Sequence, residues 1–277
     1  MGDVPFIYMR RDITARTVNK HRLQAIMDIL AVEKTVPTEE LADRLEVSMV
    51  TIRRDLKKLQ DSGKIVNGYG FVQIIESKVE QDIRFSKRLS SNRREKEALA
   101  QAALKFVEEG DVLFLDESST CYVLASALAK NFRNLHIITN AVHTLLALAG
   151  AVEFTVESSG GSIQFGFNSL IGPRAEATLN QIYANKFFFS CRAFRNEQGT
   201  YELSPFSASI KRVMLNNSQR SFLLVDHTKI GAISPYPFAK AIEIDTMIID
   251  KKVDGLPYDQ IKTIVIAENE VAQEVDP

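Results

Sequence analysis

The feature that most constrains this fold is a series of seven short apolar runs between residues 112 and 267. They cover residues 112–116, 135–139, 152–157, 186–190, 221–226, 244–250 and 263–267. Most are separated by stretches with helical periodicity. Near-continuous apolar strands that alternate with helices indicate a parallel sheet buried on both faces. The sequence therefore predicts an α/β, Rossmann-like domain with a mainly parallel sheet.

A second pattern, before this domain, consists of three short helices. Residues 21–34 carry apolar side chains at helical spacing. Thr38 and Ser48 are suited to cap the second and third helices, and Gly63 is suited to end the third. The apolar residues that we expect the third helix to turn inward are Val50, Ile52, Leu56 and Leu59.

The third helix is basic, and the segment after it predicts a hairpin. Residues 64–75 alternate around Asn67-Gly68, a dipeptide typical of tight turns. Helices, a turn, a basic helix and a hairpin, in that order, describe a winged helix-turn-helix domain. A basic helix by itself is more often the solvated face of an amphipathic helix, but the ordered combination favours DNA binding.

The expected DNA contacts follow from the docking geometry of such domains, in which the third helix enters the major groove. Arginine can bind guanine through two hydrogen bonds and discriminates by ~1–3 kcal/mol, whereas phosphate contacts set register without reading sequence. We assign base reading to Ser48, Met49, Thr51, Arg53 and Arg54, phosphate contacts to Lys57, Lys58 and Lys64, and wing contacts to Asn67 and Tyr69, with Thr38 as a further candidate.

Composition limits the classes of function. The net charge is −1, so a nucleic-acid contact must come from a local basic surface. No stretch reaches ~18 uninterrupted apolar residues, and the start lacks the apolar core of a secretory signal. Cys121 and Cys191 have no spaced partners. They fit a reducing cytoplasm, and we expect no metal site and no cofactor.

Four polar segments follow predicted strands and are candidate ligand-binding segments. The carboxyl ends of parallel strands meet in one crevice, so we expect these segments to converge. Donors at a helix N-terminus suit an anion, and glycine allows close approach of the backbone. The candidates are Asp116, Glu117, Ser118, Ser119 and Thr120; Thr139 and Asn140; Gly160 and Gly161; and Asp226 with Lys229.

Each of these segments also has a structural interpretation. Ser118 to Thr120 and the Thr139-Asn140 pair are equally consistent with helix caps. Gly160-Gly161 fits a turn, and Lys229 fits a surface lysine. The coincidence of four polar strand ends favours a ligand site over these alternatives.

The chain resembles the DeoR family of bacterial transcriptional regulators over residues 21–250. The resemblance is carried by TEELADRLEVSMVTIRRDLKKLQDSGKI in the N-terminal part and by EEGDVLFLDESSTC, ITNAV, SSGG, GPRAEATL and LLVDHTKIG in the C-terminal part. It implies a C-terminal domain with a fold like that of sugar-phosphate isomerases. It also implies sensing of phosphorylated sugars or related metabolites, with Arg174 and Lys211 in the effector pocket.

The sequence departs from the family pattern at several positions. The usual Asp-x-Gly-Thr-Thr loop is Asp116-Glu117-Ser118-Ser119-Thr120, which adds a negative charge where a phosphate would lie. A family aspartate appears as Asn185, a family acid is replaced near Ser207, and Tyr69-Gly70-Phe71 replaces a His-Gly-Gly wing. These departures leave three alternatives: the effector is a phosphorylated sugar, the effector is a less anionic molecule, or the site has weakened.

The sequence therefore predicts a cytoplasmic transcriptional regulator, a repressor of sugar-metabolism genes that binds double-stranded operator DNA and a small-molecule effector. One winged helix covers one half-site, which predicts a homodimer or homotetramer. Two alternatives stay open: a sugar-phosphate isomerase and a regulator whose C-terminal domain only oligomerises. The predicted segments are an extension (1–20), the DNA-binding domain (21–75), a linker (76–92) and the effector-sensing and oligomerisation domain (93–277).

Overall fold

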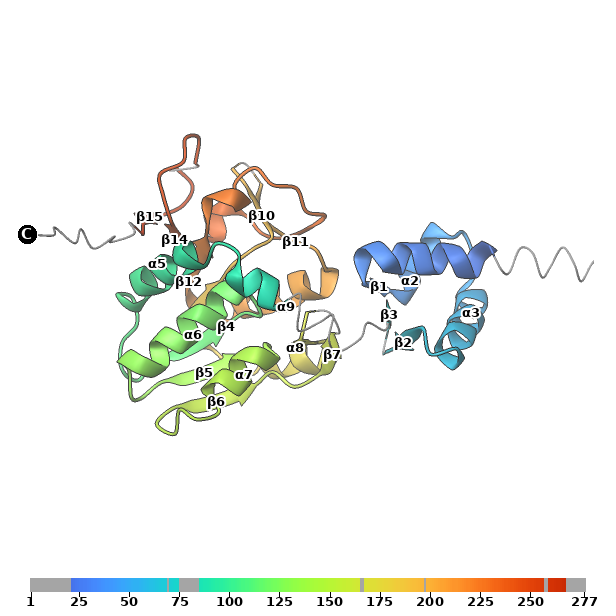
Figure 1. Cartoon of the computed structure of the whole chain (residues 1–277), viewed down its shortest axis with the longest axis horizontal. Helices are drawn as coiled ribbons and strands as arrows, with labels where there is room; N and C mark the ends of the chain where they lie inside the picture. Colours follow the sequence, from blue (N-terminus) through green and yellow to red (C-terminus); the bar gives the residue numbers. More distant parts are fainter. Residues whose placement is uncertain are drawn as a thin grey trace, which may run out of the picture. The chain divides into compact units, whose positions relative to one another are not determined.

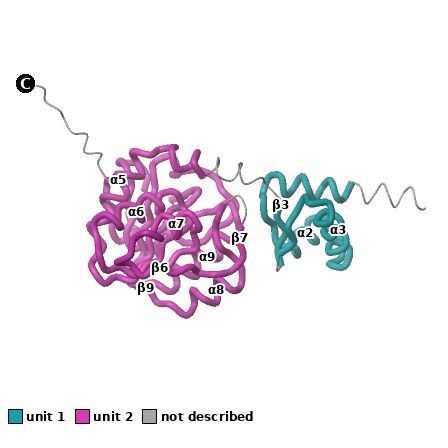
Figure 2. Tube along the Cα trace, turned by 60° about the horizontal axis from the view of Figure 1, so that its bottom comes forward, with its two compact units in different colours: residues 1–77 teal, residues 78–277 magenta. Residues whose placement is uncertain are grey.

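The computed structural model describes residues 21–68, 70–74, 85–164, 167–196, 198–256 and 259–267. Contacts divide the chain into two compact units, residues 1–77 and 78–277 (Figure 2). Each unit has its own hydrophobic core. The predicted wing residue Tyr69, the predicted extension and residues 76–84 of the predicted linker lie outside the described residues.

The N-terminal unit is a winged helix-turn-helix, as predicted (Figure 1). Its elements are a helix over residues 21–33, β1 (Thr35–Pro37), α2 (Thr38–Arg44), α3 (Met49–Asp61), β2 (Ile65–Asn67) and β3 (Phe71–Ile74). The strands form an antiparallel sheet in the order β1-β3-β2. The sequence did not predict β1, which pairs with the second strand of the hairpin and so attaches it to the helices.

The caps of α2 and α3 differ in how well they were predicted. Ser48 caps α3 by accepting a hydrogen bond from the backbone N–H of Thr51 at 3.3 Å, as expected. The prediction for Thr38 was wrong: Pro37 is the N-cap of α2, and Thr38 is the first helical residue and is buried. The N–H of Thr38 already has a partner, because it donates to the carbonyl oxygen of Gly70 at 3.0 Å.

The inward face of α3 was predicted correctly except at Val50. Ile52, Leu56 and Leu59 are buried, but Val50 is 78% exposed. Successive helical residues are rotated by about 100°, so residues 50 and 52 lie about 200° apart and cannot share one face. Val50 therefore lies on the exposed surface of the basic helix.

The C-terminal unit is built on the predicted parallel sheet (Figure 1). Its strands, in spatial order, are β15 (Thr263–Ile266), β14 (Thr246–Ile249), β12 (Ser218–Val225), β9 (Ala184–Phe189), β4 (Val112–Leu115), β5 (His136–Thr139) and β6 (Thr155–Ser158). All neighbouring strands in this sheet pair in parallel. Each strand overlaps one of the seven apolar runs.

Side chains alternate between the two faces of this sheet. Leu113 and Leu115 pack with the helices α5 (Arg93–Leu104), α6 (Ser119–Asn131) and α7 (Val142–Leu148). Phe114 lies between them in sequence and packs on the other face, 6.4 Å from the Phe187 ring. On that other face, α9 (Pro205–Asn216) contacts α8 (Pro173–Leu179) and the strands β9 and β12.

Two smaller antiparallel sheets complete the unit, and the sequence did not predict them. They are the hairpin of β7 (Ser162–Gln164) and β8 (Ser169–Ile171), and a three-stranded sheet in the order β10 (Ala193–Arg195), β11 (Gly199–Glu202), β13 (Tyr236–Ala239). Two 3-10 turns, η1 (His227–Lys229) and η2 (Ala241–Glu243), follow β12 and β13. Within the described residues, no helix combines the length and the apolar character needed to cross a bilayer.

Candidate nucleic-acid interface and ligand pocket

The exposed face of α3 carries mostly positive charge, with Asp61 at the end of the helix as its exposed acid. Arg53, Arg54, Lys57 and Lys58 are exposed, as is Lys64 just after the helix. The one acid among the first four of these, Asp55, is fully buried: its carboxylate accepts from Arg22 Nε at 2.5 Å and lies 3.6 Å from Lys58 Nζ.

The other predicted contact residues come from the cap and first turn of α3 and from the end of β2. Ser48 is exposed, and Met49, Thr51 and Asn67 are partly exposed. A face of this kind, with arginines, hydroxyls and an exposed N-terminus, is suited to phosphates and base edges. Thr38 is 6% exposed, so the structure leaves its side chain little surface for a contact.

The ligand pocket of the C-terminal unit lies at the point where the strand order of the sheet reverses. From β4 the chain adds β5 and β6 on one side, whereas β9, β12, β14 and β15 lie on the other. Ligands of open α/β sheets bind outside the carboxyl ends of strands at such a switch point. Asp116 and Ser190 end the two central strands, and the N–H of Ser190 donates to Asp116 Oδ2 at 2.9 Å.

The pocket at this point brings together several of the predicted residues. Its volume is about 170 Å³, more than ten times the ~10–15 Å³ needed for one bound water. It is therefore large enough for a small metabolite. The predicted residues that line it are Glu117, Ser118, Ser119, Thr120, Lys211, Asp226 and Lys229.

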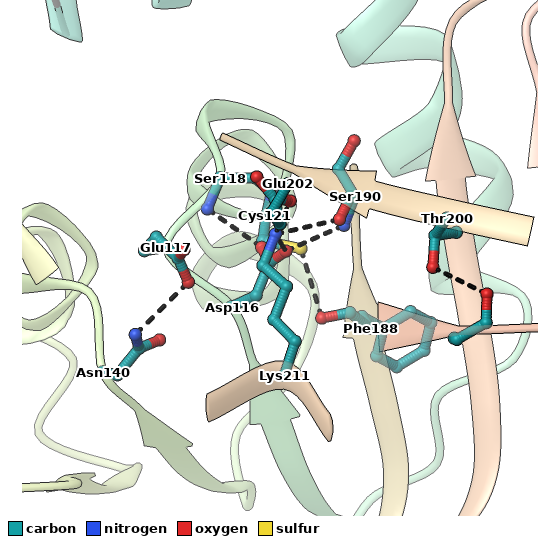
Figure 3. Close-up of polar contacts among 11 residues, drawn as sticks. Asp116, Glu117, Ser118, Cys121, Asn140, Phe188, Ser190, Thr200, Glu202 and Lys211 are labelled. Carbon is teal, nitrogen blue, oxygen red and sulfur yellow. Dashed lines mark hydrogen bonds and ion pairs between the residues drawn. The ribbon is translucent and has the colours of Figure 1, made fainter. Parts of the chain in front are cut away.

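The residues at the carboxyl ends of β5 and β6 do not line this pocket. Thr139 ends β5, Asn140 follows it, and both are fully buried. Asn140 acts on the pocket indirectly, because its Nδ2 donates to Glu117 Oε2 at 3.2 Å (Figure 3). Gly160 and Gly161 follow β6. A Cβ on Gly161 would lie 2.6 Å from the carbonyl oxygen of Ile171, so close packing explains this glycine.

Arg174 is also outside the pocket. It is exposed in the first turn of α8 and does not belong to the pocket lining. Glu176, two residues further along α8, accepts a hydrogen bond from the Ser209 hydroxyl at 2.6 Å. The structure therefore supplies no effector contact for Arg174.

A buried cluster of one lysine and two acids adjoins the pocket: Lys211 and Glu202 line it, whereas the predicted site residue Asp116 does not. Lys211 Nζ lies 2.8 Å from Asp116 Oδ2, donates to Glu202 Oε1 at 2.5 Å and donates to the carbonyl oxygen of Ser190 at 3.0 Å (Figure 3). Lys211 is 2% exposed and Asp116 is fully buried. Three hydrogen bonds satisfy the ammonium, which is the arrangement that a buried charge requires.

Burial and mutual attraction act in opposite directions on the pKa values of this cluster. Burial alone would lower the pKa of Lys211, but Asp116, Glu202 and Glu117 raise it well above its ordinary value. Burial would raise the pKa of Asp116, yet Lys211 and hydrogen bonds from Ser118 and Ser190 hold it below the ordinary value. Burial dominates at Glu202, and its pKa is raised although Lys211 opposes the shift.

Glu202 is a pocket residue that the sequence did not identify. Its carboxylate compensates for one of the departures from the family pattern. The family acid near Ser207 is absent, but Glu202 at the end of β11 supplies a carboxylate to Lys211 from another element. The departure at Asn185 does not concern the pocket. Asn185 Oδ1 accepts from the N–H of Val112 at 2.8 Å, at the opposite, amino end of the sheet.

The N-terminus of α6 forms another wall of the pocket. Ser118 is the N-cap: its Oγ accepts from the N–H of Cys121 at 3.0 Å, and its own N–H donates to Asp116 Oδ1 at 2.9 Å. Ser119 and Thr120 occupy the first turn, where N–H groups lack intrahelical partners. Helix capping and a ligand site are thus compatible interpretations of this segment.

Neither cysteine has the properties of a nucleophile. Cys121 and Cys191 are both buried, and burial raises the pKa of each thiol. Within the described part of the chain, no cluster of three or more His, Cys, Asp or Glu side chains is placed to hold a metal ion.

The remaining wall comes from the start of α5 and the segment before it, which the sequence did not identify either. Arg88, Ser91, Asn92 and Lys96 line the pocket there, and Phe167, Cys191, Arg192 and Leu203 complete it together with Ser190 and Glu202. Asp226, which follows β12, connects the two sides, because its Oδ1 accepts from Asn92 Nδ2 at 3.1 Å. These residues are distant in sequence and share no local pattern.

A winged helix-turn-helix joined to an α/β domain with a polar pocket at its switch point defines a DNA-binding regulator with a ligand-sensing domain. The chain belongs to the DeoR family. Residues 22–78 match the DeoR-like helix-turn-helix domain, and residues 91–251 match the DeoR C-terminal sensor domain.

Similar proteins are themselves transcriptional regulators. An HTH-type regulator of Bacillus subtilis is 32% identical over 84% of this chain and 89% of its own length. The L-fucose operon activator of Escherichia coli is 31% identical over 83% and 95%, and the lactose phosphotransferase system repressor of Staphylococcus aureus is 29% identical over 90% and 98%. These relatives favour the regulator over the isomerase alternative.

Among solved structures, ribose 5-phosphate isomerase A of Methanocaldococcus jannaschii aligns with a TM-score of 0.39 and 16% identity. The alignment covers 50% of this chain and 55% of that chain.

Proposed function

We propose that this protein regulates sugar-utilisation genes in the cytoplasm, as a repressor that binds double-stranded operator DNA and responds to a phosphorylated sugar. The observation that carries the proposal is the polar pocket at the β4–β9 switch point, with Ser118, Ser119 and Thr120 at a helix N-terminus. Two similar proteins, an L-fucose operon activator and a lactose phosphotransferase system repressor, support a sugar as the signal.

The proposed DNA contact is the exposed face of α3. Arg53 and Arg54 would read guanine edges, and Lys57, Lys58 and Lys64 would bind phosphates. Val50 joins the base-reading residues because it is 78% exposed beside Ser48 and Thr51. An apolar side chain at this position is suited to the methyl group of thymine, which only the major groove presents.

The proposed effector site uses the two kinds of groups that line the pocket. The first turn of α6 and the basic side chains Arg192 and Lys229 would bind a phosphate. Glu117, which Asn140 holds by a hydrogen bond, would accept hydrogen bonds from sugar hydroxyls. Its charge also repels a nearby dianion, so Glu117 sets a limit on how tightly a phosphate binds.

The proposed mechanism is a shift between two arrangements of the chain. An effector that binds the DNA-free arrangement more tightly releases the operator, by a coupling of ~1–3 kcal/mol. Specific binding of two half-sites requires a homodimer or homotetramer. We assign DNA binding to residues 21–75 and effector sensing with oligomerisation to residues 93–277, joined through residues 76–92.

A thermal-shift panel of phosphorylated and neutral sugars tests this function on the full chain. A ligand at 100 times its Kd stabilises the folded state by ~2.7 kcal/mol, which a melting curve resolves. We expect phosphorylated sugars to stabilise and their neutral parents not to do so. If no member of the panel stabilises the protein while it still retards operator DNA, the sensor domain serves only in oligomerisation.

The variant Glu117→Gly refines the test of the ligand. Removing the carboxylate from the pocket should tighten binding of the phosphorylated sugar found in the panel. Isothermal titration calorimetry of wild type and variant measures the change. Equal or weaker binding by the variant would show that Glu117 contributes a hydrogen bond rather than repulsion.

A further inference from the structure

Lys96 is the most unusual charged residue of the pocket, because it is buried without an ion pair. It lies in the first turn of α5, lines the pocket and is 5% exposed. None of the ion pairs among the described residues involves it, whereas Lys211 in the same pocket contacts two carboxylates. A buried charge in a cleft that lacks a counter-ion is a candidate for ligand binding.

The ammonium of Lys96 is held by backbone oxygens of the segment before α5. Its Nζ donates to the carbonyl oxygen of Arg88 at 2.5 Å and to that of Ser91. An ammonium has three N–H donors, so one donor remains for a group inside the pocket. Burial lowers the pKa of Lys96, and Asp226 partly offsets this effect. An anion bound beside Lys96 would relieve that cost.

The Arg88 carbonyl is where the pocket and this segment meet. It accepts from Lys96 Nζ and, at 3.4 Å, from the hydroxyl of Ser119. Both donors line the pocket, and both are of the kind that binds phosphate oxygens. A ligand that takes hydrogen bonds from Lys96 and Ser119 therefore competes directly with the Arg88 carbonyl.

Residues 85–92 have further anchors on the C-terminal unit at both ends of the segment. The Phe85 ring stacks on His143 with centroids 3.7 Å apart and meets Tyr122 edge-on at 5.3 Å. Asn92 donates to Asp226 and adopts a left-handed backbone conformation with φ of 50°. In sequence, this segment comes directly before the sensor domain and after the DNA-binding unit.

We propose that Lys96 is an anion-binding residue of the effector pocket, and that a bound effector withdraws Lys96 and Ser119 from the Arg88 carbonyl and so loosens residues 85–92. The inference rests on the proposed function because it takes the effector to be anionic. Through the Arg88 carbonyl, Lys96 and Ser119 connect the pocket to the segment that precedes the sensor domain in sequence.

Hydrogen–deuterium exchange of the full chain, with and without inorganic phosphate at pH 8, tests both parts. In wild type, we expect phosphate to raise the exchange rate of amides 85–92 by about tenfold. Lys96→Met should bind phosphate at least about tenfold more weakly and should show fast exchange of this segment without phosphate. Lys229→Met is the matched control: it removes a pocket lysine that does not bond to residues 85–92, so it should weaken binding but keep the response at saturation.

Ser119→Ala keeps the test decisive if Lys96→Met folds poorly. It removes one hydroxyl from the Arg88 carbonyl and should raise exchange of residues 85–92 by a smaller factor. If wild type binds neither phosphate nor any sugar phosphate, the proposed function fails together with the inference. If wild type binds but Lys96→Met or Ser119→Ala leaves both affinity and exchange unchanged, or phosphate binds without changing exchange, the inference alone fails.

Discussion

The basic helix α3 and the pocket of the C-terminal unit use charge in opposite ways. On α3, the cations Arg53, Arg54 and Lys57 are exposed, and the acid between them is buried against Arg22. In the pocket, Lys211 is buried and its charge is balanced by two carboxylates. Exposed cations attract a polyanion over a distance and are screened by salt, whereas a buried, bonded cation fixes geometry and is hardly screened.

This difference predicts where a substitution acts. Removing a cation from α3 should change DNA affinity and leave the fold intact, because the side chain has few partners in the protein. Removing Lys211 should damage the fold itself, because its partners cannot be solvated. Substitutions on α3 and in the pocket therefore test this contrast, and we expect the largest effect at Lys211.

Lys211→Met should destabilise the C-terminal unit by ~3–5 kcal/mol, because it leaves Asp116 charged and unpaired at 0% exposure. Lys229→Met, a lysine of the same pocket that is only partly buried, should change stability by less than ~0.5 kcal/mol. The chain has no tryptophan, so differential scanning calorimetry is the suitable measurement. Adding Asp116→Asn to Lys211→Met should recover part of the loss; similar melting of both lysine variants would contradict the contrast.

Arg53→Ala should weaken binding to specific operator DNA by ~1–3 kcal/mol and to random DNA much less, because arginine reads guanine edges. Lys57→Ala should weaken both equally and reduce the slope of log K against log salt by ~0.9. Fluorescence anisotropy at several salt concentrations separates the two. Equal losses for Arg53→Ala on both DNAs would reassign Arg53 to a phosphate.

The affinity of the pocket for sulfate should rise as pH falls through the raised pKa of Glu202. Above that pKa, the carboxylate is ionised and repels an anion; below it, protonation removes the negative charge beside Lys211. The expected change is on the order of fivefold. Sulfate keeps its charge over this range, so calorimetric titration reports the protein alone. In Glu202→Gln the rise should be smaller, and an unchanged rise would assign it to another group.

Val50→Ala should have the smallest effect and weaken binding to operator DNA by about fourfold, because a methyl contact is worth ~0.8 kcal/mol per buried carbon. Replacing thymines of a genomic operator by uracil, one at a time, removes the partner methyl. Wild type should lose affinity at one position, and Val50→Ala should lose nothing further there. Wild-type indifference to every uracil substitution would remove Val50 from the base-reading residues.

The parallel sheet was predictable because its strands are contiguous apolar runs buried on both faces. The small sheet of β10, β11 and β13 was not, because its strands have three or four residues and β11 pairs with the sequence-distant strand β13. The phase of α3 misled the prediction only at Val50, which is the second residue of the helix and so has no preceding helical turn to fix its face.

The candidate site was predictable only where a strand end carried polar residues. Ser118 to Thr120 and Asp226 follow apolar strands and reach the pocket. Glu202 and Lys96 come from a short antiparallel strand and from a helix start, where acids and lysines are common on surfaces. Only the three-dimensional arrangement distinguishes these two from ordinary exposed charges.

Two acids on one lysine have an evolutionary consequence. Lys211 bonds to Asp116 and to Glu202, which belong to different parts of the chain. When one carboxylate is replaced, the other still neutralises the ammonium, so we expect the intermediate variant to fold. Descendants can therefore relocate an acid around this lysine one substitution at a time, and the ligand preference of the pocket can drift while the scaffold persists.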